Sequence, residues 1–148
     1  MLKLRPSQFQ DAERTLQIWE RAVDATHDFL LAADRRAIGE EVASFLPAAP
    51  LLLAVDANDV PQAFMLVVDG HMEALFVDPQ YFGSGVGRQL VAHALAGAPQ
   101  LTTDVNAQNA QALGFYQRLG FVETGRSALD GQGRPYPLIH LRYAGVHN

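Results

Sequence analysis

The stretch LFVDPQYFGSGVGRQL, residues 75–90, decides the fold of this chain. Its first residues, with Ala74 before them, form an apolar run typical of the end of a buried strand. Asp78-Pro79 ends that strand, because proline cannot donate a hydrogen bond to the ladder. The glycine-rich segment 83–87 then leads directly into a helical run. The first N–H groups of a helix have no acceptor within it, so this loop predicts a site for the phosphate oxygens of a cofactor.

Two common phosphate-binding loops do not match this spacing. The glycines fall at 83, 85 and 87, which gives G-x-G-x-G rather than the G-x-G-x-x-G of dinucleotide-binding folds. A P-loop needs lysine and then serine or threonine after its last glycine, whereas Arg88 and Gln89 stand here. A nucleotide-binding protein that uses the same glycines for NAD or ATP is therefore the weaker alternative.

The spacing instead resembles the acetyl-CoA loop of the GNAT N-acetyltransferases, Arg/Gln-x-x-Gly-x-Gly/Ala after a V-D-P strand end. Residues 106–121, NAQNAQALGFYQRLGF, are similar to the signature N-x-x-A-x-x-F-Y-x-x-x-G-F of that family. Segments 23–30 and 133–138 resemble its bacterial YjaB-like branch, and the resemblance covers nearly the whole chain. The chain departs from the family at Phe82, where Arg or Gln is usual. One side-chain contact to phosphate is lost there, while the backbone contacts remain.

Periodicity and turn residues predict the order β-α-α-β-β-β-α-β-α-β-β. Strands are expected over 2–5, 51–55, 62–68, 71–77 and 101–105, with one beginning at Phe121 and one running through Ile139 and Leu141. Helices are expected after a Ser7 or Asp11 cap, over 35–45, from the glycine loop to about 96, and from an Asn106 cap to Gly120. This order matches the GNAT fold, an α/β fold (α+β by some schemes) with a single mixed, mostly antiparallel sheet of about seven strands and helices on both faces.

Composition narrows the class of protein. A chain of 148 residues, 49% apolar, is expected to form one soluble domain, 1–148. Its net charge of −5, without a Lys/Arg run, argues against nucleic acid as a partner. The absence of cysteine excludes disulfides, a thiolate nucleophile and Cys-ligated zinc, and it is compatible with the cytoplasm. No metal and no membrane contact are expected, and a homodimer stays open.

Acetyl transfer to an amine needs a proton acceptor for the amine, a donor for the carbonyl oxygen and a proton for the departing thiolate. Without cysteine, direct attack in a ternary complex is favoured over an acyl-enzyme. Tyr116 is the candidate acid, because a phenol pKa of about 10 exceeds a thiol pKa of about 8.5 and keeps the proton at neutral pH. Helical spacing places Asn109, Leu113 and Tyr116 on one face. The alternative is a core tyrosine whose hydroxyl is satisfied locally.

The candidate base is Glu73, acting directly or through water. Strand alternation places His71, Glu73, Leu75 and Val77 on one face that leads toward the loop. His71 competes for this role, since its reference pKa is about 6.5. The alternative for both residues is a solvated place on an exposed strand.

The resemblance implies the remaining roles. Tyr116 is the family's general acid, and Asn109 helps to hold the pantetheine arm. The main chain at the end of the strand pairs with pantetheine, and the loop binds the pyrophosphate. The implied cofactor-binding residues are Leu75, Phe76, Val77, Phe82, Gly83, Ser84, Gly85, Val86, Gly87, Arg88, Asn109 and Tyr116. His27, Asp28 and Phe29, between the first two helices, are expected to contact the acceptor, together with His71.

The sequence thus favours an N-acetyltransferase that uses acetyl-CoA and no metal. The acceptor is a small-molecule amine or an amine of a peptide or protein, and the family's fold does not choose between them. An acyl-CoA-binding sensor with little catalytic activity is the alternative of a different class, since it needs the loop but no base.

Overall fold

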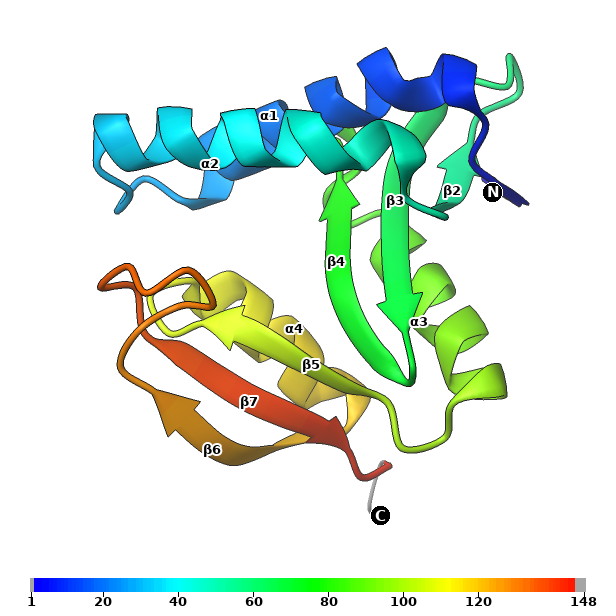
Figure 1. Cartoon of the computed structure of the whole chain (residues 1–148). Coiled ribbons are helices and arrows are strands. Elements are labelled where there is room, and N and C mark those ends of the chain that lie inside the picture. The colour runs from blue at the N-terminus through cyan, green and yellow to red at the C-terminus, as the bar shows by residue number, and fades with distance from the viewer. Residues whose placement is uncertain (1, 146–148) are drawn as a thin grey trace. The chain divides into compact units, whose positions relative to one another are not determined.

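The computed structural model describes residues 2–145 (Figure 1). Its strands and α-helices follow the order expected from the sequence. The elements are β1 (Lys3–Pro6), α1 (Ala12–Thr26), α2 (Ala32–Phe45), β2 (Leu52–Val55), β3 (Pro61–Val68), β4 (His71–Val77), α3 (Val86–Gly97), β5 (Thr102–Asn106), α4 (Ala110–Leu119), β6 (Phe121–Ser127) and β7 (Leu138–Tyr143). Short 3₁₀ turns are η1 (Phe9–Asp11), η2 (Leu46–Ala48) and η3 (Pro79–Tyr81).

The strands form one mixed sheet in the order β1-β2-β3-β4-β5-β7-β6. The β1–β2, β2–β3, β5–β7 and β6–β7 pairs are antiparallel, whereas β4 and β5 are parallel. Asp69 and Gly70 turn β3 into β4 with φ of 51° and 77°, as a tight hairpin requires. The parallel pairing covers His71↔Thr102 and Met72↔Thr103, and β4 continues beyond it to Val77. The mixed, mostly antiparallel sheet expected from the sequence is confirmed.

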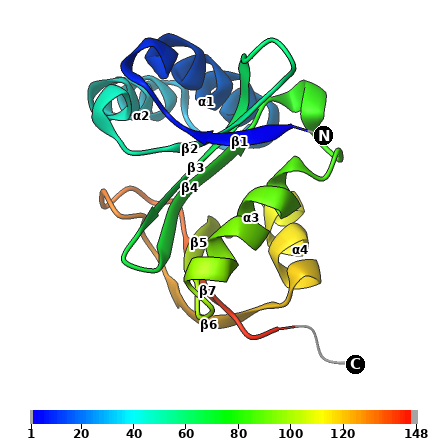
Figure 2. The same ribbon diagram turned by 90° about the vertical axis from the view of Figure 1, so that its right-hand side faces the viewer.

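The chain divides into two compact units, which are described separately. Of the described residues, the first unit contains 2–66 and Ala74–Val91, and the second contains Val67–Glu73 and 92–145. In the first unit α1 and α2 lie side by side and pack on β2 and β3 (Figures 1 and 2). Apolar residues at helical spacing on α1 and in alternation on the strands form this core. Its buried members include Ile18, Trp19, Val23, Val42, Leu46, Leu51, Leu53, Val55, Phe64 and Leu66.

In the second unit α4 covers one face of the strands β5, β7 and β6 (Figure 2). A row of aromatic rings joins them, because Phe121 contacts both Tyr116 and Tyr143 with ring centroids 5.4 Å apart in each pair. Edge-to-face geometry of this kind is the arrangement that aromatic rings prefer. The side chains of Leu101, Ile139 and Leu141 are also buried in this unit.

Three expectations about helix starts are corrected. Asn106 lies in β5 and its side chain accepts from the Gln108 N–H, while Asn109 caps α4 by accepting from the Ala112 N–H at 3.1 Å. Asp11 stands at the N-cap of α1 without a side-chain cap bond, because its carboxylate binds Arg5 and the Gln8 N–H. Helix α2 begins at Ala32 rather than at 35, because the Arg35 N–H already donates to the Leu31 carbonyl at 2.9 Å and closes a first helical turn.

Candidate active site

The glycine loop has the backbone that phosphate binding requires. Gly83 and Gly85 have φ of 75° and 92°, and a Cβ on either would meet nothing within 4 Å. Glycine is therefore needed for its conformation rather than for lack of space. The first i→i−4 hydrogen bond of α3 runs from the Gln89 N–H to the Gly85 carbonyl at 3.0 Å. The N–H groups of the three preceding residues, 86–88, have no acceptor within the helix and lie at its positive end.

Asp78 anchors the start of this loop. It is 1% exposed and follows the last residue of β4, as expected for a strand that ends at Asp78-Pro79. Its carboxylate accepts from Arg14 at 3.0 Å and from Arg21 at 3.0 and 3.2 Å. It also accepts from the Gln80 N–H at 3.1 Å, inside the turn η3. Both arginines belong to α1, so this helix fixes the position of the loop within the first unit.

Hydrogen bonds stabilise the negative charge of Asp78 in its buried position. Burial by itself raises the pKa of this carboxyl group. The hydrogen bonds from Arg21, the Gln80 N–H and Arg14 outweigh burial, so the pKa lies below its ordinary value. Arg14 in addition donates to the Pro61 carbonyl and to the Gln62 side chain, each at 2.8 Å. The anchor thus connects α1, the start of β3 and the loop.

Among the apolar residues before the loop, Ala74 and Phe76 pack against the core of the first unit. Phe76 packs on Phe64 with ring centroids 5.5 Å apart, and Leu75, Phe76 and Val77 are partly buried. The expected pantetheine contacts are those of their main chain. Phe82 is 39% exposed at the entrance to the loop, where the family usually has a cation or an amide.

Tyr116 is buried in α4, with 7% of its surface exposed. Burial raises its pKa above the ordinary value, and a side-chain hydrogen bond with Thr103 opposes this only in part. The phenol therefore keeps its proton, as a general acid must at neutral pH. Its hydroxyl also has the local partner that a core tyrosine requires.

Asn109 caps α4 rather than lying within it. Its side-chain oxygen is engaged by the Ala112 N–H, so its NH₂ group is what remains for a pantetheine amide. Glu73 is exposed on β4, which fits both a base and a solvated residue of an exposed strand. His71, two residues before it, is bound at both ring nitrogens. Nδ1 lies 2.7 Å from Thr102 Oγ1, and Nε2 lies 3.4 Å from Asp104 Oδ2.

His27 and Phe29 come together in the connection between α1 and α2. Their ring centroids are 5.2 Å apart, and His27 Nδ1 lies 2.7 Å from the Thr26 hydroxyl. Burial lowers the pKa of His27, and the neighbouring Asp28 opposes this effect. The ring is therefore mostly neutral at pH 7, suited to hydrogen bonding rather than to charge pairing.

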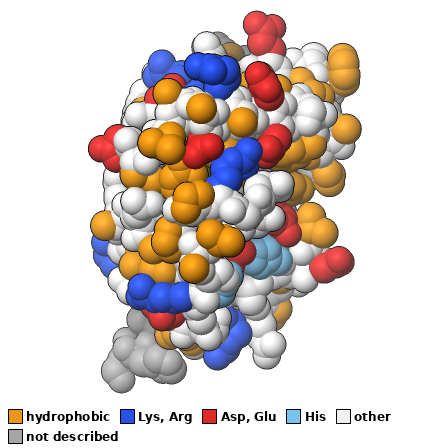
Figure 3. Space-filling model, turned by 60° about the vertical axis from the view of Figure 1, so that its left-hand side comes forward, with side chains coloured by type: hydrophobic (Ala, Val, Ile, Leu, Met, Phe, Trp, Pro, Cys, Tyr) orange, Lys and Arg blue, Asp and Glu red, His pale blue; other side chains and the backbone are white. Residues whose placement is uncertain are grey.

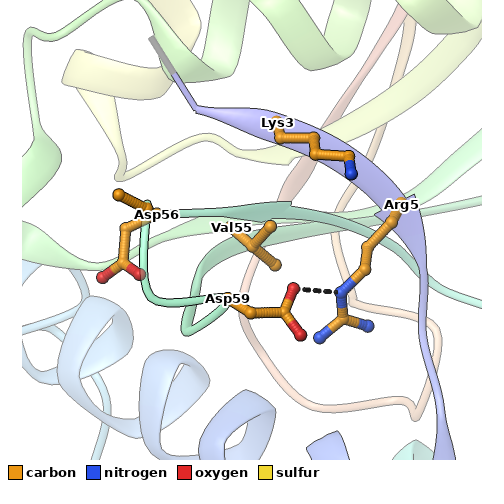
Figure 4. A pocket seen from close by; sticks show the side chains of 6 residues that line it. Lys3, Arg5, Val55, Asp56 and Asp59 are labelled. Atoms are coloured by element: carbon orange, nitrogen blue, oxygen red, sulfur yellow. Dashed lines mark hydrogen bonds and ion pairs between the residues drawn. The ribbon is translucent and has the colours of Figure 1, made fainter.

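A shallow hollow of the first unit lies away from the glycine loop. It is lined by Lys3, Arg5, Val55, Asp56, Ala57 and Asp59 (Figure 4). Arg5 binds Asp59 at 2.8 Å and Asp11 at 2.9 Å, so its charge is already compensated. Within residues 2–145 no group of three or more His, Asp or Glu side chains could hold a metal ion. No helix of the same segment is long and apolar enough to cross a membrane.

Comparison with known proteins identifies the family to which this chain belongs. The acetyltransferase (GNAT) domain matches residues 27–123. The chain belongs to this family and is an N-acetyltransferase.

Two relatives are similar over their full length. The chain is 53% identical over 146 residues to the peptidyl-lysine N-acetyltransferase YjaB of Escherichia coli (strain K12), covering 99% of each. It is 52% identical over 143 residues to YjaB of Salmonella typhimurium (strain LT2), covering 97% of this chain and 99% of the relative. The YjaB-like branch expected from the sequence is confirmed.

Solved structures of related proteins have the same fold as this chain. The solution structure of apo-form YjaB from E. coli has a TM-score of 0.95 at 53% identity and covers 99% of each chain. A PaiA N-acetyltransferase from Thermoplasma acidophilum, solved with coenzyme A, has a TM-score of 0.76 at 16% identity. It covers 97% of this chain and 99% of its own, and at that identity it shows the shared fold alone.

Sequence reasoning missed two groups of residues. The partners of Asp78 come from α1, and a signal existed, because Arg14 and Arg21 are seven residues apart on one helix face. Asp104 and His140 lie opposite each other on β5 and β7. That contact depends on a strand register that the sequence does not reveal.

Proposed function

We propose that this chain transfers an acetyl group from acetyl-CoA to the side-chain amine of lysine in peptides or proteins. The observation that carries the proposal is the glycine loop at the start of α3, in a chain of the GNAT family. The acceptor is inferred from likeness over the full length to relatives described as peptidyl-lysine N-acetyltransferases. Both YjaB relatives are themselves bacterial.

The first unit binds the cofactor's phosphates. The N–H groups of 86–88 and those of Gly83 and Gly85 donate to the pyrophosphate oxygens, whereas the Ser84 N–H bonds to the Tyr81 carbonyl. The helix dipole favours the phosphate charge. Arg88 adds a cation near them. The main chain of Leu75 to Val77 pairs with the pantetheine amides, and the NH₂ of Asn109 donates to the same arm. Because Phe82 offers no charge, affinity depends on the backbone donors.

The reaction is a direct attack of the amine nitrogen on the thioester carbonyl carbon. The C–N bond forms, the C–S bond breaks, and the sulfur takes the proton of Tyr116. The nitrogen sheds its second proton as the amide forms, and that proton restores the phenol of Tyr116 through water. Glu73 accepts the proton of the ammonium group, directly or through one water. His27, Phe29 and His71 contact the acceptor side chain. Acetyl-CoA supplies the activated acyl group, and no metal takes part.

The test is an acetyl-CoA consumption assay over a matched panel of acceptors. The panel contains a peptide with one internal lysine and a blocked N-terminus, the same peptide with arginine in place of lysine, and the unblocked arginine peptide. A polyamine and an aminoglycoside complete it. CoA release with the lysine peptide alone is the expected result, and mass spectrometry should place the acetyl group on the lysine Nε. Release with the polyamine or the free N-terminus instead overturns the acceptor assignment.

Glu73→Gln tests the base. Since glutamine keeps the shape but cannot take a proton, kcat should fall by about a hundredfold. The affinity for acetyl-CoA, measured by calorimetry, should stay the same. Glu13→Gln, the same change in the first turn of α1, is the control and should retain full turnover. Equal turnover of the Glu73 variant and the parent removes Glu73 from the reaction.

A further inference from the structure

A row of hydrogen bonds crosses the strands β6, β7 and β5 of the second unit. Ser127 Oγ lies 2.6 Å from His140 Nε2, and His140 Nδ1 lies 2.6 Å from Asp104 Oδ1. The strands are neighbours in the sheet, and Asp104 stands opposite His140 in the register of β5 with β7. Backbone pairing therefore fixes the contact between the two side chains.

The carboxylate determines which ring nitrogen of His140 carries the proton. An ionised carboxylate only accepts hydrogen bonds, so Nδ1 donates to Asp104. In the neutral ring Nε2 keeps its lone pair and accepts the hydroxyl proton of Ser127. The three residues are thus connected through the same atoms as the triad of a serine hydrolase.

A second histidine holds the other carboxylate oxygen. His71 Nε2 lies 3.4 Å from Asp104 Oδ2, and the Thr102 hydroxyl lies 2.7 Å from His71 Nδ1. Asp104 is therefore held from both sides, which limits its rotation. The side chains of Asp104 and His140 are 36% and 35% exposed, so a small molecule can reach them from solvent. Figure 3 shows histidine side chains at the surface with an acidic side chain against them.

This array is separate from Tyr116. Thr103 is buried and bonds to Tyr116, which belongs to α4. Successive residues of a strand face opposite sides, so Thr102 and Asp104 face away from α4. The environment of Ser127 also differs from that of Ser7 and Ser44. Ser7 and Ser44 donate to backbone carbonyls, whereas Ser127 contacts an imidazole.

We propose that Ser127 is an activated nucleophile, which gives the chain a slow esterase activity on small activated esters, distinct from acetyl transfer to amines. Ser127 Oγ bonds to the ester carbonyl carbon while His140 Nε2 takes its proton. The C–O bond to the leaving alcohol breaks, and the imidazolium returns the proton to that alcohol. Water then attacks the Ser127 ester, and Ser127 regains a proton through His140 as the carboxylic acid leaves.

The test is hydrolysis of p-nitrophenyl acetate by the full chain without CoA. Ser127→Ala and His140→Gln should each lower the rate by about a hundredfold, the contribution of a positioned base. Ser44→Ala is the matched control, because it removes an exposed hydroxyl that no histidine activates. Its rate should equal that of the parent chain. Unchanged hydrolysis in Ser127→Ala overturns the proposal.

Labelling provides a readout that does not depend on turnover. A fluorophosphonate probe should modify Ser127 in the parent chain and leave it unmodified in His140→Gln, as read by peptide mass spectrometry. Equal labelling of Ser44 and Ser127 overturns the proposal. Amine acetylation is measured in parallel. A chain that acetylates amines without hydrolysing the ester contradicts only this inference, and the reverse outcome contradicts only the proposed function.

Discussion

At the scale of single residues, the hydroxyl of Tyr116 is the group on which the proposed chemistry most depends. Its raised pKa keeps it protonated, so it can give a proton to a departing thiolate. Tyr116→Phe removes only that hydroxyl and should lower kcat by about a hundredfold while leaving acetyl-CoA affinity intact. The lost bond to Thr103 should cost about 1 kcal/mol of stability. Steady-state kinetics and calorimetry measure the two effects separately.

Tyr143→Phe is the control at the same scale. Tyr143 belongs to the same row of rings, in contact with Phe121, so the substitution makes the same chemical change on the same face. Its turnover should match that of the parent chain. Comparable losses in both variants mean that the phenol of Tyr116 acts through packing rather than through its proton.

At the scale of elements, the loop before α3 depends on backbone geometry. Gly85 has a φ of 92°, a backbone angle that residues other than glycine rarely adopt. Gly85→Ala should destabilise the chain by about 1–2 kcal/mol and weaken acetyl-CoA binding, because the N–H donors move out of place. Gly97→Ala, at the end of the same helix, is the control. It lies in open space without a positive φ and should leave binding unchanged in calorimetry.

At the scale of the whole molecule, acid should unfold the chain through its buried carboxylates. The pKa of Asp78 is lower in the folded chain than in the unfolded one. Its contribution to stability is therefore complete above the unfolded pKa of about 3.9 and is lost as the pH falls through the folded value. Asp78→Asn should cost about 3 kcal/mol near pH 7, because two arginines lose a buried partner. The difference from the parent should shrink in acid.

Urea unfolding between pH 3 and 7 measures this difference. Asp59→Asn is the matched control, since Asp59 pairs with Arg5 while its side chain is 71% exposed. Asparagine also tolerates its φ of 63°. This variant should change stability by less than about 1 kcal/mol at every pH. A pH-independent gap for Asp78→Asn contradicts the assigned ion pairs.

Patterns of neighbouring residues predict most of the fold, whereas contacts between residues far apart in the sequence leave no such pattern. The Asp69-Gly70 turn, the strand break at Asp78-Pro79 and the glycine loop depend on backbone preferences of neighbouring residues, and each lies where expected. Asn106 and Asn109 offer the same side chain three residues apart, so the sequence favours Asn106 as the cap of α4, whereas Asn109 caps it. The partners of Asp78 and of Asp104 come from distant elements. The spacing of Arg14 and Arg21 shows that they share a helix face but not which residue they bind, and the pairing of Asp104 depends on a strand register that no local pattern encodes.

The contact of Arg14 and Arg21 with Asp78 has a practical consequence for anyone who shortens this chain. The segment that matches the family, 27–123, begins one residue after α1 ends. An expression fragment trimmed to those limits would discard both guanidinium groups and leave a sequestered anion without counterions. Such a fragment should aggregate or bind the cofactor more weakly, although it retains every glycine of the loop. A truncated chain should therefore keep the residues that form ion pairs with the loop, even where they lie outside the segment of sequence similarity.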